Sequence, residues 1–295
     1  MEKRYILSMD GGGVRTIASI TFLKKLEEHL QVPLAEKFDF FIGTSAGAIS
    51  CLGIAINRMP AADLINILSK ENLIKIMTNS SWETSLGIMQ INPKYTNEGK
   101  REVLTKFFAD KKLKDANKPV AVTSYDIEKR LPVLLTSYTD QEISVVDSGD
   151  ATSAAPVYYP TAEVGDRFLI DGGIVANHPV LHGYVEAKKL YPDNELVVLS
   201  VGTGLNKRSL KGKDSKKWGL IGWMMHDLFG LMVESSMDHE LAEELIGKNY
   251  LRINSPLGRV NRRLDDSSDS NIERIISMGE SWWEELGQRT LDLLE

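Results

Sequence analysis

The sequence is poor in the residues that build disulfide scaffolds and metal sites. It contains a single cysteine among 295 residues, so no disulfide can form within the chain and an extracellular disulfide scaffold is excluded. Cys51 lies in an apolar segment, where we expect a buried core thiol. The five histidines and the carboxylates show no metal-ligand spacing. We therefore expect no metal and no other cofactor.

Long apolar runs and an excess of positive charge are also missing. The residues before Asp10 include charges and no extended apolar stretch, which does not match a secretory signal. The formal net charge is −6 and no basic stripe stands out, which argues against nucleic acid as a partner. We therefore expect a cytoplasmic protein that has no signal peptide or transmembrane segment and meets membranes only peripherally.

The segment 40–57 is the one that comes closest to a membrane span, because it carries no charge. Its glycines, serines and Asn57 dilute the apolarity, so a span is the weaker interpretation. An apolar strand, the run Gly-Thr-Ser-Ala-Gly at 43–47 and a small-residue helix follow in the order of a nucleophile elbow, with Ser45 at its tip. Flanking glycines suit a strained turn, and the helix start directs N–H groups toward Ser45. Alone, the pattern is equally compatible with an ordinary tight turn.

A glycine-rich turn precedes this elbow. A strand from Tyr5 to Met9 runs into Asp-Gly-Gly-Gly-Val-Arg at 10–15, and a helical pattern follows. A Walker A loop is excluded because no Gly-Lys-Ser/Thr follows, and a dinucleotide fingerprint lacks its third glycine, at Thr16. Successive parallel strands end at the same edge of a sheet, so this loop is well placed to form an oxyanion hole for Ser45.

The remaining pattern alternates strands and helices, as in an α/β protein. Expected helices span 61–70, 98–108, 145–156, 180–190 and 271–295, and expected strands span 120–124, 131–137, 168–170, 195–201 and 250–254. The segment 78–96 has no clear period and could cover a site. No repeat or linker divides the chain, so we expect one domain over 1–295, with its motifs within about 5–204 and a mainly helical part over 205–295.

A segment rich in tryptophan and methionine, 218–247, follows the basic stretch Lys207–Lys217. We expect its aromatic side chains to pack onto the sheet, in the core or in a lid. The alternative is that Trp218 and Trp223 contact lipid while the lysines meet anionic headgroups.

A third glycine-flanked motif supplies a carboxylate, Asp171, at the end of the expected strand 168–170. Serine at neutral pH is a weak nucleophile and needs an adjacent base. A carboxylate on a tight turn, shielded from water, gains proton affinity and can serve as that base. His178 is the rival base, because Ser45, Asp171 and His178 occur in the order of an α/β-hydrolase triad. Against a triad, Asp171 and His178 lie on one short loop.

Together these motifs resemble the patatin-like phospholipase family. That family combines an Asp-Gly-Gly-Gly-x-Arg-Gly loop, a Gly-x-Ser-x-Gly elbow and an Asp-Gly-Gly/Ala turn, and the resemblance runs from about Tyr5 to Gly204. Ala-Thr-Ser-Ala-Ala-Pro at 151–156 and Asn-His-Pro at 177–179 are similar to further blocks of the family. Thr16 departs from the last glycine of the loop. The resemblance implies a three-layer α/β/α sandwich with a mostly parallel central sheet.

The resemblance also implies a mechanism and a substrate. It implies a catalytic dyad of Ser45 and Asp171 that hydrolyses lipid acyl esters through an acyl-enzyme. The oxyanion hole would comprise Gly11, Gly12 and Gly13, and the supporting residues would be Arg15, Gly43, Gly47, Gly172 and Gly173. The substrate would be a phospholipid or lysophospholipid at a membrane surface, and a regulatory small molecule or protein is left unspecified.

Two alternatives remain open at this point. The same dyad could pass the acyl group to another alcohol, which is an acyltransferase reaction. A non-catalytic module could instead bind a phosphorylated ligand on the glycine loop, with Ser45 only a turn residue. The presence of both Ser45 and Asp171 favours an enzyme, because a binding module needs neither. For Arg15 we favour a structural ion pair over contact with an anionic ligand.

Overall fold

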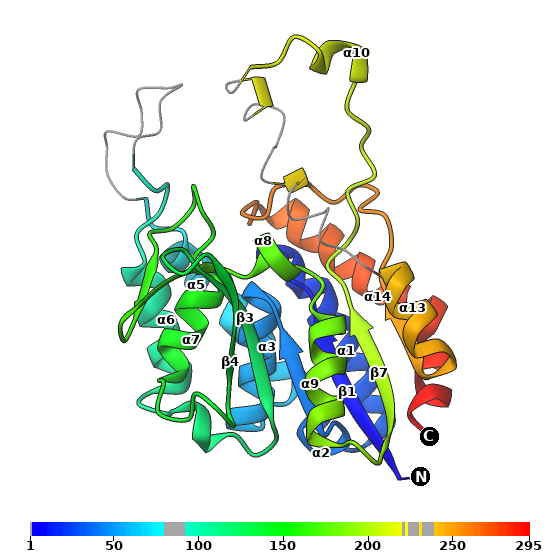
Figure 1. Ribbon diagram of the computed structural model, residues 1–295. Coiled ribbons are helices and arrows are strands. Elements are labelled where there is room, and N and C mark those ends of the chain that lie inside the picture. The colour runs from blue at the N-terminus through cyan, green and yellow to red at the C-terminus, as the bar shows by residue number, and fades with distance from the viewer. Residues whose placement is uncertain (1, 80–91, 220–221, 224–229, 232–238) are drawn as a thin grey trace.

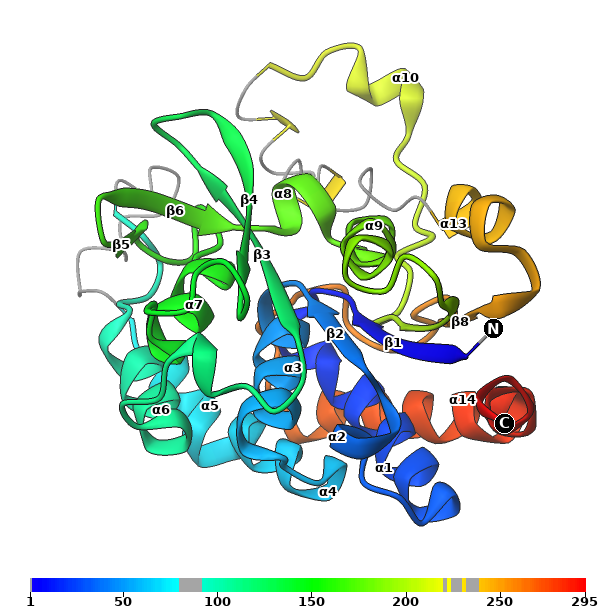
Figure 2. The same ribbon diagram turned by 60° about the horizontal axis from the view of Figure 1, so that its bottom comes forward.

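The computed structural model describes residues 2–79, 92–219, 222–223, 230–231 and 239–295. In these ranges an eight-stranded, mostly parallel sheet lies between two layers of helices (Figures 1 and 2). The predicted α/β/α sandwich is therefore confirmed. Within the same ranges, no helix combines the length and the apolar character needed to cross a membrane.

The sheet has the strand order β5-β6-β3-β2-β1-β7-β8, and β4 pairs with β3 off this path. The strands are β1 (Lys3–Met9), β2 (Phe40–Gly43), β3 (Val120–Asp126), β4 (Leu131–Thr136), β5 (Ala162–Val164), β6 (Arg167–Asp171), β7 (Glu195–Val201) and β8 (Tyr250–Ile253). Pairs among β3, β2, β1, β7 and β8 are parallel, whereas the pairs that involve β4, β5 or β6 are antiparallel. The strand predicted at 250–254 is present as β8, which extends the same sheet after residue 205.

Helices cover both faces of this sheet (Figure 2). On one face lie α1 (Thr16–Leu30), α2 (Leu34–Lys37), α3 (Ser45–Asn57), α4 (Ala61–Leu64), α5 (Lys70–Ile76), α6 (Glu98–Phe108), α7 (Val145–Thr152) and α14 (Asp269–Leu294). On the other face lie α9 (Val180–Leu190) and α13 (His239–Ile246). Shorter helical turns are η1 (Gly13–Arg15), η2 (Ile65–Leu68), η4 (Leu113–Asp115), α8 (Gly173–Ala176), α10 (Gly212–Ser215) and η5 (Gly247–Asn249).

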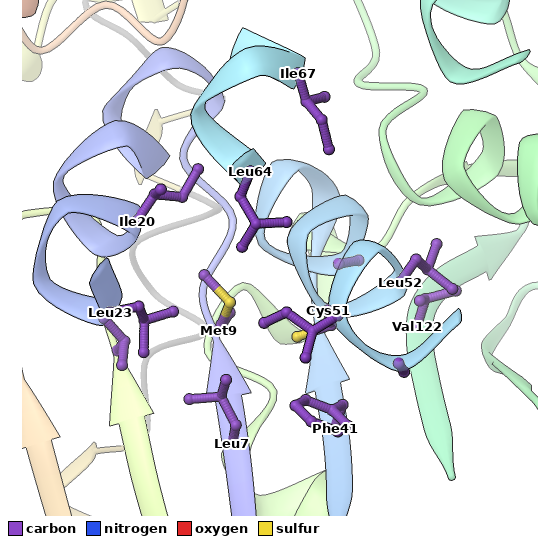
Figure 3. Packing of buried hydrophobic residues seen from close by; sticks show 14 of the residues in the cluster. Leu7, Met9, Ile20, Leu23, Phe41, Cys51, Leu52, Leu64, Ile67 and Val122 are labelled. Carbon is purple, nitrogen blue, oxygen red and sulfur yellow. The ribbon is translucent and has the colours of Figure 1, made fainter. Parts of the chain in front are cut away.

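Two hydrophobic cores follow from the alternation of side chains along the strands. On β1, Leu7 and Met9 belong to the larger core under α1, α3 and α14, whereas Ile6 belongs to the smaller core under α9. Phe41 on β2 joins the larger core, and Figure 3 shows it beside Cys51 of α3. Cys51 is fully buried, as predicted.

The segment after Lys217 departs from the predicted core helix. Trp218 is not helical, and its ring packs edge to face on Trp223 with centroids 5.2 Å apart. Both side chains are only half-buried, so a place in the sheet core is wrong for these two residues. The neighbouring stretches 220–221, 224–229 and 232–238 lie outside the described residues, as does 80–91 within the segment 78–96.

Candidate active site

The glycine loop and the serine turn lie side by side because β1 and β2 are adjacent and parallel. Their last residues, Met9 and Gly43, are direct partners in the sheet. The two turns are packed so closely that only glycine fits on either side of the serine. A Cβ atom on Gly47 would lie 2.3 Å from the carbonyl oxygen of Asp10, and one on Gly43 would lie 2.5 Å from the Cα of Ala48. Both glycines are therefore required for this close approach.

Ser45 occupies the tip of the turn in a strained conformation. Its φ is 52°, in the left-handed region that residues with a side chain rarely adopt. Its N–H donates a hydrogen bond of 3.0 Å to the Oγ1 of Thr152, the last residue of α7. Such strain persists only where the surrounding structure enforces it, and it concentrates at functional sites. The geometry is that of a nucleophile elbow.

The position of Asp171 follows from the way two strands share one edge of β3. β2 pairs with the first half of β3, where Gly43 is opposite Val122, and β6 pairs with the second half, where Asp171 is opposite Ser124. β4 pairs along the whole of the other edge. β2 is parallel to β3 and β6 is antiparallel to it, so the carboxyl ends of β2 and β6 face each other across Thr123.

This meeting of strand ends brings the serine and the carboxylate together. A Cβ atom on Gly172 would lie 2.1 Å from Thr123 Oγ1, so the residue after Asp171 must be glycine for β6 to end here. The N–H of Gly173 donates to Asp171 Oδ1 over 2.7 Å. Ser45 and Asp171 line the same cavity, and the Ser45 side chain is near enough to the carboxylate to oppose the rise of its pKa.

Asp171 is a buried carboxylate with increased basicity. Asp171 is only 5 % exposed to solvent. Burial raises the pKa of Asp171 to about 6, against the opposing effects of the Gly173 N–H, the Ser45 hydroxyl and the Lys100 charge. Asp171 is therefore ionised at neutral pH and accepts a proton more readily than a surface aspartate does.

The glycine loop lies beside Ser45, and its three N–H groups differ in their bonding. The N–H of Gly11 already donates to the carbonyl oxygen of Asn177 over 3.1 Å, so it is not available to a ligand. Among the described residues, no acceptor bonds to the N–H of Gly12 or Gly13, and both glycines line the cavity next to Ser45. Gly13 has a φ of 54°, which glycine adopts without strain. The N–H groups of Gly12 and Gly13 are therefore the two in this loop that remain available as donors.

The cavity beside Ser45 has one polar end and apolar walls. Ser45, Asp171, Gly12 and Gly13 line the polar end. Apolar walls are supplied by α3, η2, α5 and α6, through Ile49, Ile67, Leu73, Ile76, Val103 and Leu104. Such a space accepts a long apolar group whose reactive carbonyl lies at the polar end. Within the described part of the chain, no three His, Cys, Asp or Glu side chains are grouped to hold a metal ion.

His178 is not brought to Ser45. It is not among the described residues that line the cavity, and its Nε2 lies 2.9 Å from Ser200 Oγ on β7 and 3.4 Å from the Tyr250 hydroxyl on β8. Burial, with the nearby charges of Arg252 and His239, lowers the pKa of His178 well below its usual value. A neutral histidine in this cluster has no contact through which to serve Ser45 as a base.

A buried ion pair supports the glycine loop from behind. Asp10 is fully buried, and both of its carboxylate oxygens accept hydrogen bonds from Arg252 of β8, one of them over 2.9 Å. Arg252 also donates to Ser200 over 2.7 Å. Burial raises the pKa of Asp10, against the charges of Arg252 and Arg15. Arg15 is itself buried, outside the set of described residues that line the cavity.

Thr16, at the position where the loop departs from the family pattern, is fully buried as the first residue of α1, so this helix still packs closely. Two contributors to the site, Lys100 and Arg252, carried no motif in the sequence, whereas Thr152 lies within the block at 151–156. Thr152 and Lys100 contact it from α7 and α6, and Arg252 contacts it from β8. A signal existed for Arg252, because it interrupts an apolar strand pattern at 250–253.

A strained serine and a buried carboxylate line the polar end of an apolar cavity in an α/β/α sandwich, which is an arrangement typical of a lipid hydrolase. Comparison with known families agrees, because the model of the patatin-like phospholipase family matches residues 7–183. The chain belongs to the patatin-like phospholipase family, and the predicted resemblance is confirmed.

Individual relatives include enzymes and plant proteins. The chain is 34 % identical over 261 residues to a cGAMP-activated phospholipase of Pseudomonas aeruginosa, covering 84 % of this chain and 77 % of that protein. It is 29 % identical over 328 residues to patatin-like protein 4 of Arabidopsis thaliana, covering 93 % and 82 %. The crystal structure of VipD from Legionella pneumophila superposes with a TM-score of 0.56 at 13 % identity, covering 99 % of this chain and 66 % of VipD, and supports the fold.

Proposed function

We propose that the protein is a serine-dependent acyl hydrolase of the phospholipase A or lysophospholipase type. The observation that carries the proposal is that Ser45, in its strained turn, and the buried carboxylate of Asp171 lie together at the polar end of an apolar cavity. Family membership supports a lipid hydrolase, and this pairing supports a Ser-Asp dyad as its chemistry.

Acylation uses the polar end of the cavity. The acyl chain of the ester lies along the apolar wall, and Ser45 Oγ attacks the carbonyl carbon while Asp171 accepts the hydroxyl proton. The negative charge that develops on the carbonyl oxygen is stabilised by the N–H groups of Gly12 and Gly13. The tetrahedral intermediate then expels the lipid alcohol, which takes the proton from Asp171. Gly11 has a structural role here, since its N–H is bonded to Asn177.

Deacylation repeats these steps with water. Asp171 accepts a proton from the water as its oxygen bonds to the acyl carbon. The bond to Ser45 Oγ then breaks, the serine oxygen takes the proton from Asp171, and the fatty acid leaves. One base serves both halves of the cycle, so His178 is not needed.

The two other candidate activities make different products. An acyltransferase would use the same acyl-enzyme and replace water by a second alcohol, so a labelled lysophospholipid acceptor would become diacylated. A phosphate-binding module is disfavoured by the apolar walls of the cavity. The ammonium that lines this cavity, Lys100, already bonds to the carbonyl oxygens of Asp150 and Ser153.

A lipid-class screen tests the proposal. Purified wild-type protein is expected to release fatty acid from phospholipid or lysophospholipid, and Ser45→Ala is expected to reduce that rate on the order of 10⁴-fold or more, because the nucleophile is lost. The screen is run with and without cGAMP, since one relative is named for activation by it. Ser50→Ala is the matched control, since Ser50 lines the same cavity one turn later on α3.

The screen has clear opposing outcomes. Activity that survives in Ser45→Ala, or wild type that releases no fatty acid from any lipid class under either condition, would contradict the proposal. Diacylated product without free fatty acid would replace it by the acyltransferase. Ser50→Ala is expected to stay within roughly tenfold of wild type, since its hydroxyl only bonds to the Ala46 carbonyl of its own helix.

A basic surface segment offers a route to the bilayer. The stretch 207–217 contains one acidic residue, Asp214, and six exposed cations, Lys207, Arg208, Lys211, Lys213, Lys216 and Lys217. It projects from the body after β7 (Figure 1), and the end of β7 is tied to the glycine loop by a bond of 2.9 Å from Thr203 Oγ1 to the Gly11 carbonyl. Docking of this stretch on anionic lipid would therefore bring the edge of the sheet that holds Ser45 to the membrane.

We expect Lys216→Glu/Lys217→Glu to weaken binding to vesicles that contain phosphatidylserine by roughly 10-fold or more, at about 1 kcal/mol for each cation. Its melting temperature should equal that of wild type, because both side chains are exposed. The matched control is Lys188→Glu/Lys189→Glu, an exposed pair at the end of α9 near the opposite edge of the sheet. Equal losses in both variants, measured by vesicle flotation, would show that only overall charge matters.

A further inference from the structure

One short segment contacts both members of the proposed dyad. The Oγ1 of Thr152, at the end of α7, accepts the N–H of Ser45 over 3.0 Å. Two residues later, the carbonyl oxygen of Ala154 accepts the N–H of Asp171 over 3.1 Å. Thr152 and Ala154 are fully buried. A shift of this segment, residues 150–154, would therefore move the nucleophile and the base together.

The same segment is held by a buried lysine. Lys100 of α6 donates from Nζ to the carbonyl oxygens of Asp150, over 3.2 Å, and Ser153, over 3.1 Å. The same Nζ lies 2.9 Å from Asp150 Oδ1 and 4.2 Å from the centre of the Tyr159 ring. The carbonyl groups at the end of a helix lack partners within it, and a cation there also meets the negative end of the helix dipole. Lys100 thus caps α7.

An ammonium is an expensive group to place here. Lys100 is 3 % exposed and lines the cavity together with Val103 and Leu104, three and four residues later on the same face of α6. An apolar side chain would suit that face, and burying a charge costs several kcal/mol even when it is paired. Asp150 also has a second partner, since Arg101 donates to its Oδ2 over 3.0 Å. Neutralising Asp150 is therefore not what requires Lys100.

We propose that Lys100 is a positioning residue for the reaction: by capping α7 from inside the cavity, it fixes Thr152 and Ala154, and through them Ser45 and Asp171. The inference rests on the proposed function of these two residues. Lys100 itself touches neither the ester nor the attacking oxygen in this scheme. It converts a helix end, which would otherwise fray, into a rigid support for both reacting groups.

The charge of Lys100 supplies a readout that a purely structural residue would not affect. The groups that act on Asp171 are the N–H of Gly173 in α8, the hydroxyl of Ser45 in α3 and the ammonium of Lys100 in α6. All three lower the pKa of Asp171 against its burial. Without the ammonium, Asp171 would become protonated at a higher pH. The acid limb of the pH–rate profile, where the base is lost, should then move to higher pH.

The test compares three variants by ester hydrolysis across pH, with melting temperature as the check on folding. Lys100→Met removes the ammonium and keeps the unbranched, flexible stem of the side chain. Thr152→Val removes the hydroxyl that holds the Ser45 N–H and keeps the shape. Lys106→Met removes an exposed lysine from the same helix as a control. Wild type and Ser45→Ala are measured first, since activity that does not depend on Ser45 would overturn the proposed function itself.

We expect Lys100→Met to lower kcat by about 10- to 100-fold with little change in KM, because misplaced reacting groups cost that much, and to move the acid limb to higher pH. Thr152→Val is expected to lower kcat without moving this limb, since it removes no charge. Lys106→Met should match wild type.

The inference is overturned if Lys100→Met has the kcat of wild type and the same acid limb in its pH–rate profile, whether or not its melting temperature is lower. If Lys100→Met does not fold, Thr152→Val decides: unchanged kcat there overturns the role of the segment 150–154, and a fall in kcat with the limb in place supports it.

Discussion

Replacing Asp171 with asparagine is expected to abolish ester hydrolysis in a protein that still folds. Asparagine has the same shape and can still accept the N–H of Gly173, but it has no affinity for a proton. Because the nucleophile and its base act as a unit, the loss should approach that of Ser45→Ala, on the order of 10⁴-fold or more. A variant that keeps most of its activity toward p-nitrophenyl esters would show that Asp171 is not the base.

The pH dependence of the wild type gives an independent check on this assignment. Since burial raises the pKa of Asp171 to about 6, kcat/KM is expected to fall as the pH drops through about 6. Folding raises this pKa, so ionised Asp171 lowers the stability of the folded state at neutral pH. The neutral asparagine should therefore melt no lower than wild type at pH 7. A large drop in melting temperature would instead show a structural role for the carboxylate.

Arg252→Met is expected to cause the largest loss of stability. Asp10 is fully buried and would keep its charge without the partner that bonds to both of its oxygens. Breaking a buried pair in this way costs about 3–5 kcal/mol in the free energy of unfolding, measured by denaturant titration. The pKa of Asp10, already raised by burial, would rise further. The deficit should therefore be smaller at low pH, where Asp10 takes up a proton in the folded state.

Two further variants show whether this loss belongs to the pair. Asp10→Asn/Arg252→Met removes the orphaned charge and should recover much of the stability. Arg4 of β1 forms a more exposed ion pair with Asp39. Arg4→Met should therefore lower the free energy of unfolding by no more than about 1 kcal/mol. If Arg252→Met costs no more than Arg4→Met, the buried pair does not support the glycine loop.

Local patterns were sufficient for most elements and for the residues of the three motifs. The helix at 180–190 and the strand at 195–201 have the predicted bounds, because the helix begins after a proline and the strand is a mostly apolar run closed by a glycine. The elbow was recognisable for a physical reason. The backbone packs so closely around Ser45 that only glycine fits at positions 43 and 47, and this requirement is visible as a motif in the sequence.

The pairing of strands across the sheet could not be predicted from these patterns. The period of a strand tells which residues share a face, but it does not tell which strand lies beside it or in which direction. The antiparallel β6, which carries Asp171, was therefore not distinguishable from a parallel strand. Nor does the sequence show that the Gly11 N–H is bonded to Asn177, or that Lys100 of an amphipathic helix faces inward. Trp218 was expected in the core because the segment around it is rich in apolar residues. It is half-buried, because composition does not show which residues pack around a side chain.

The meeting of β2 and β6 on one edge of β3 also bears on how the protein matures. β2 is synthesised early and β6 much later, and their ends are aligned only once β3 lies beside both. Pairings between such distant parts of a chain form slowly, because a long loop must close first. A nascent chain that has emerged only as far as the elbow would hold Ser45 without Asp171. If Ser45 and Asp171 act together as proposed, lipid cleavage should begin only when this sheet is complete, and a partly folded chain would leave its lipid substrate intact.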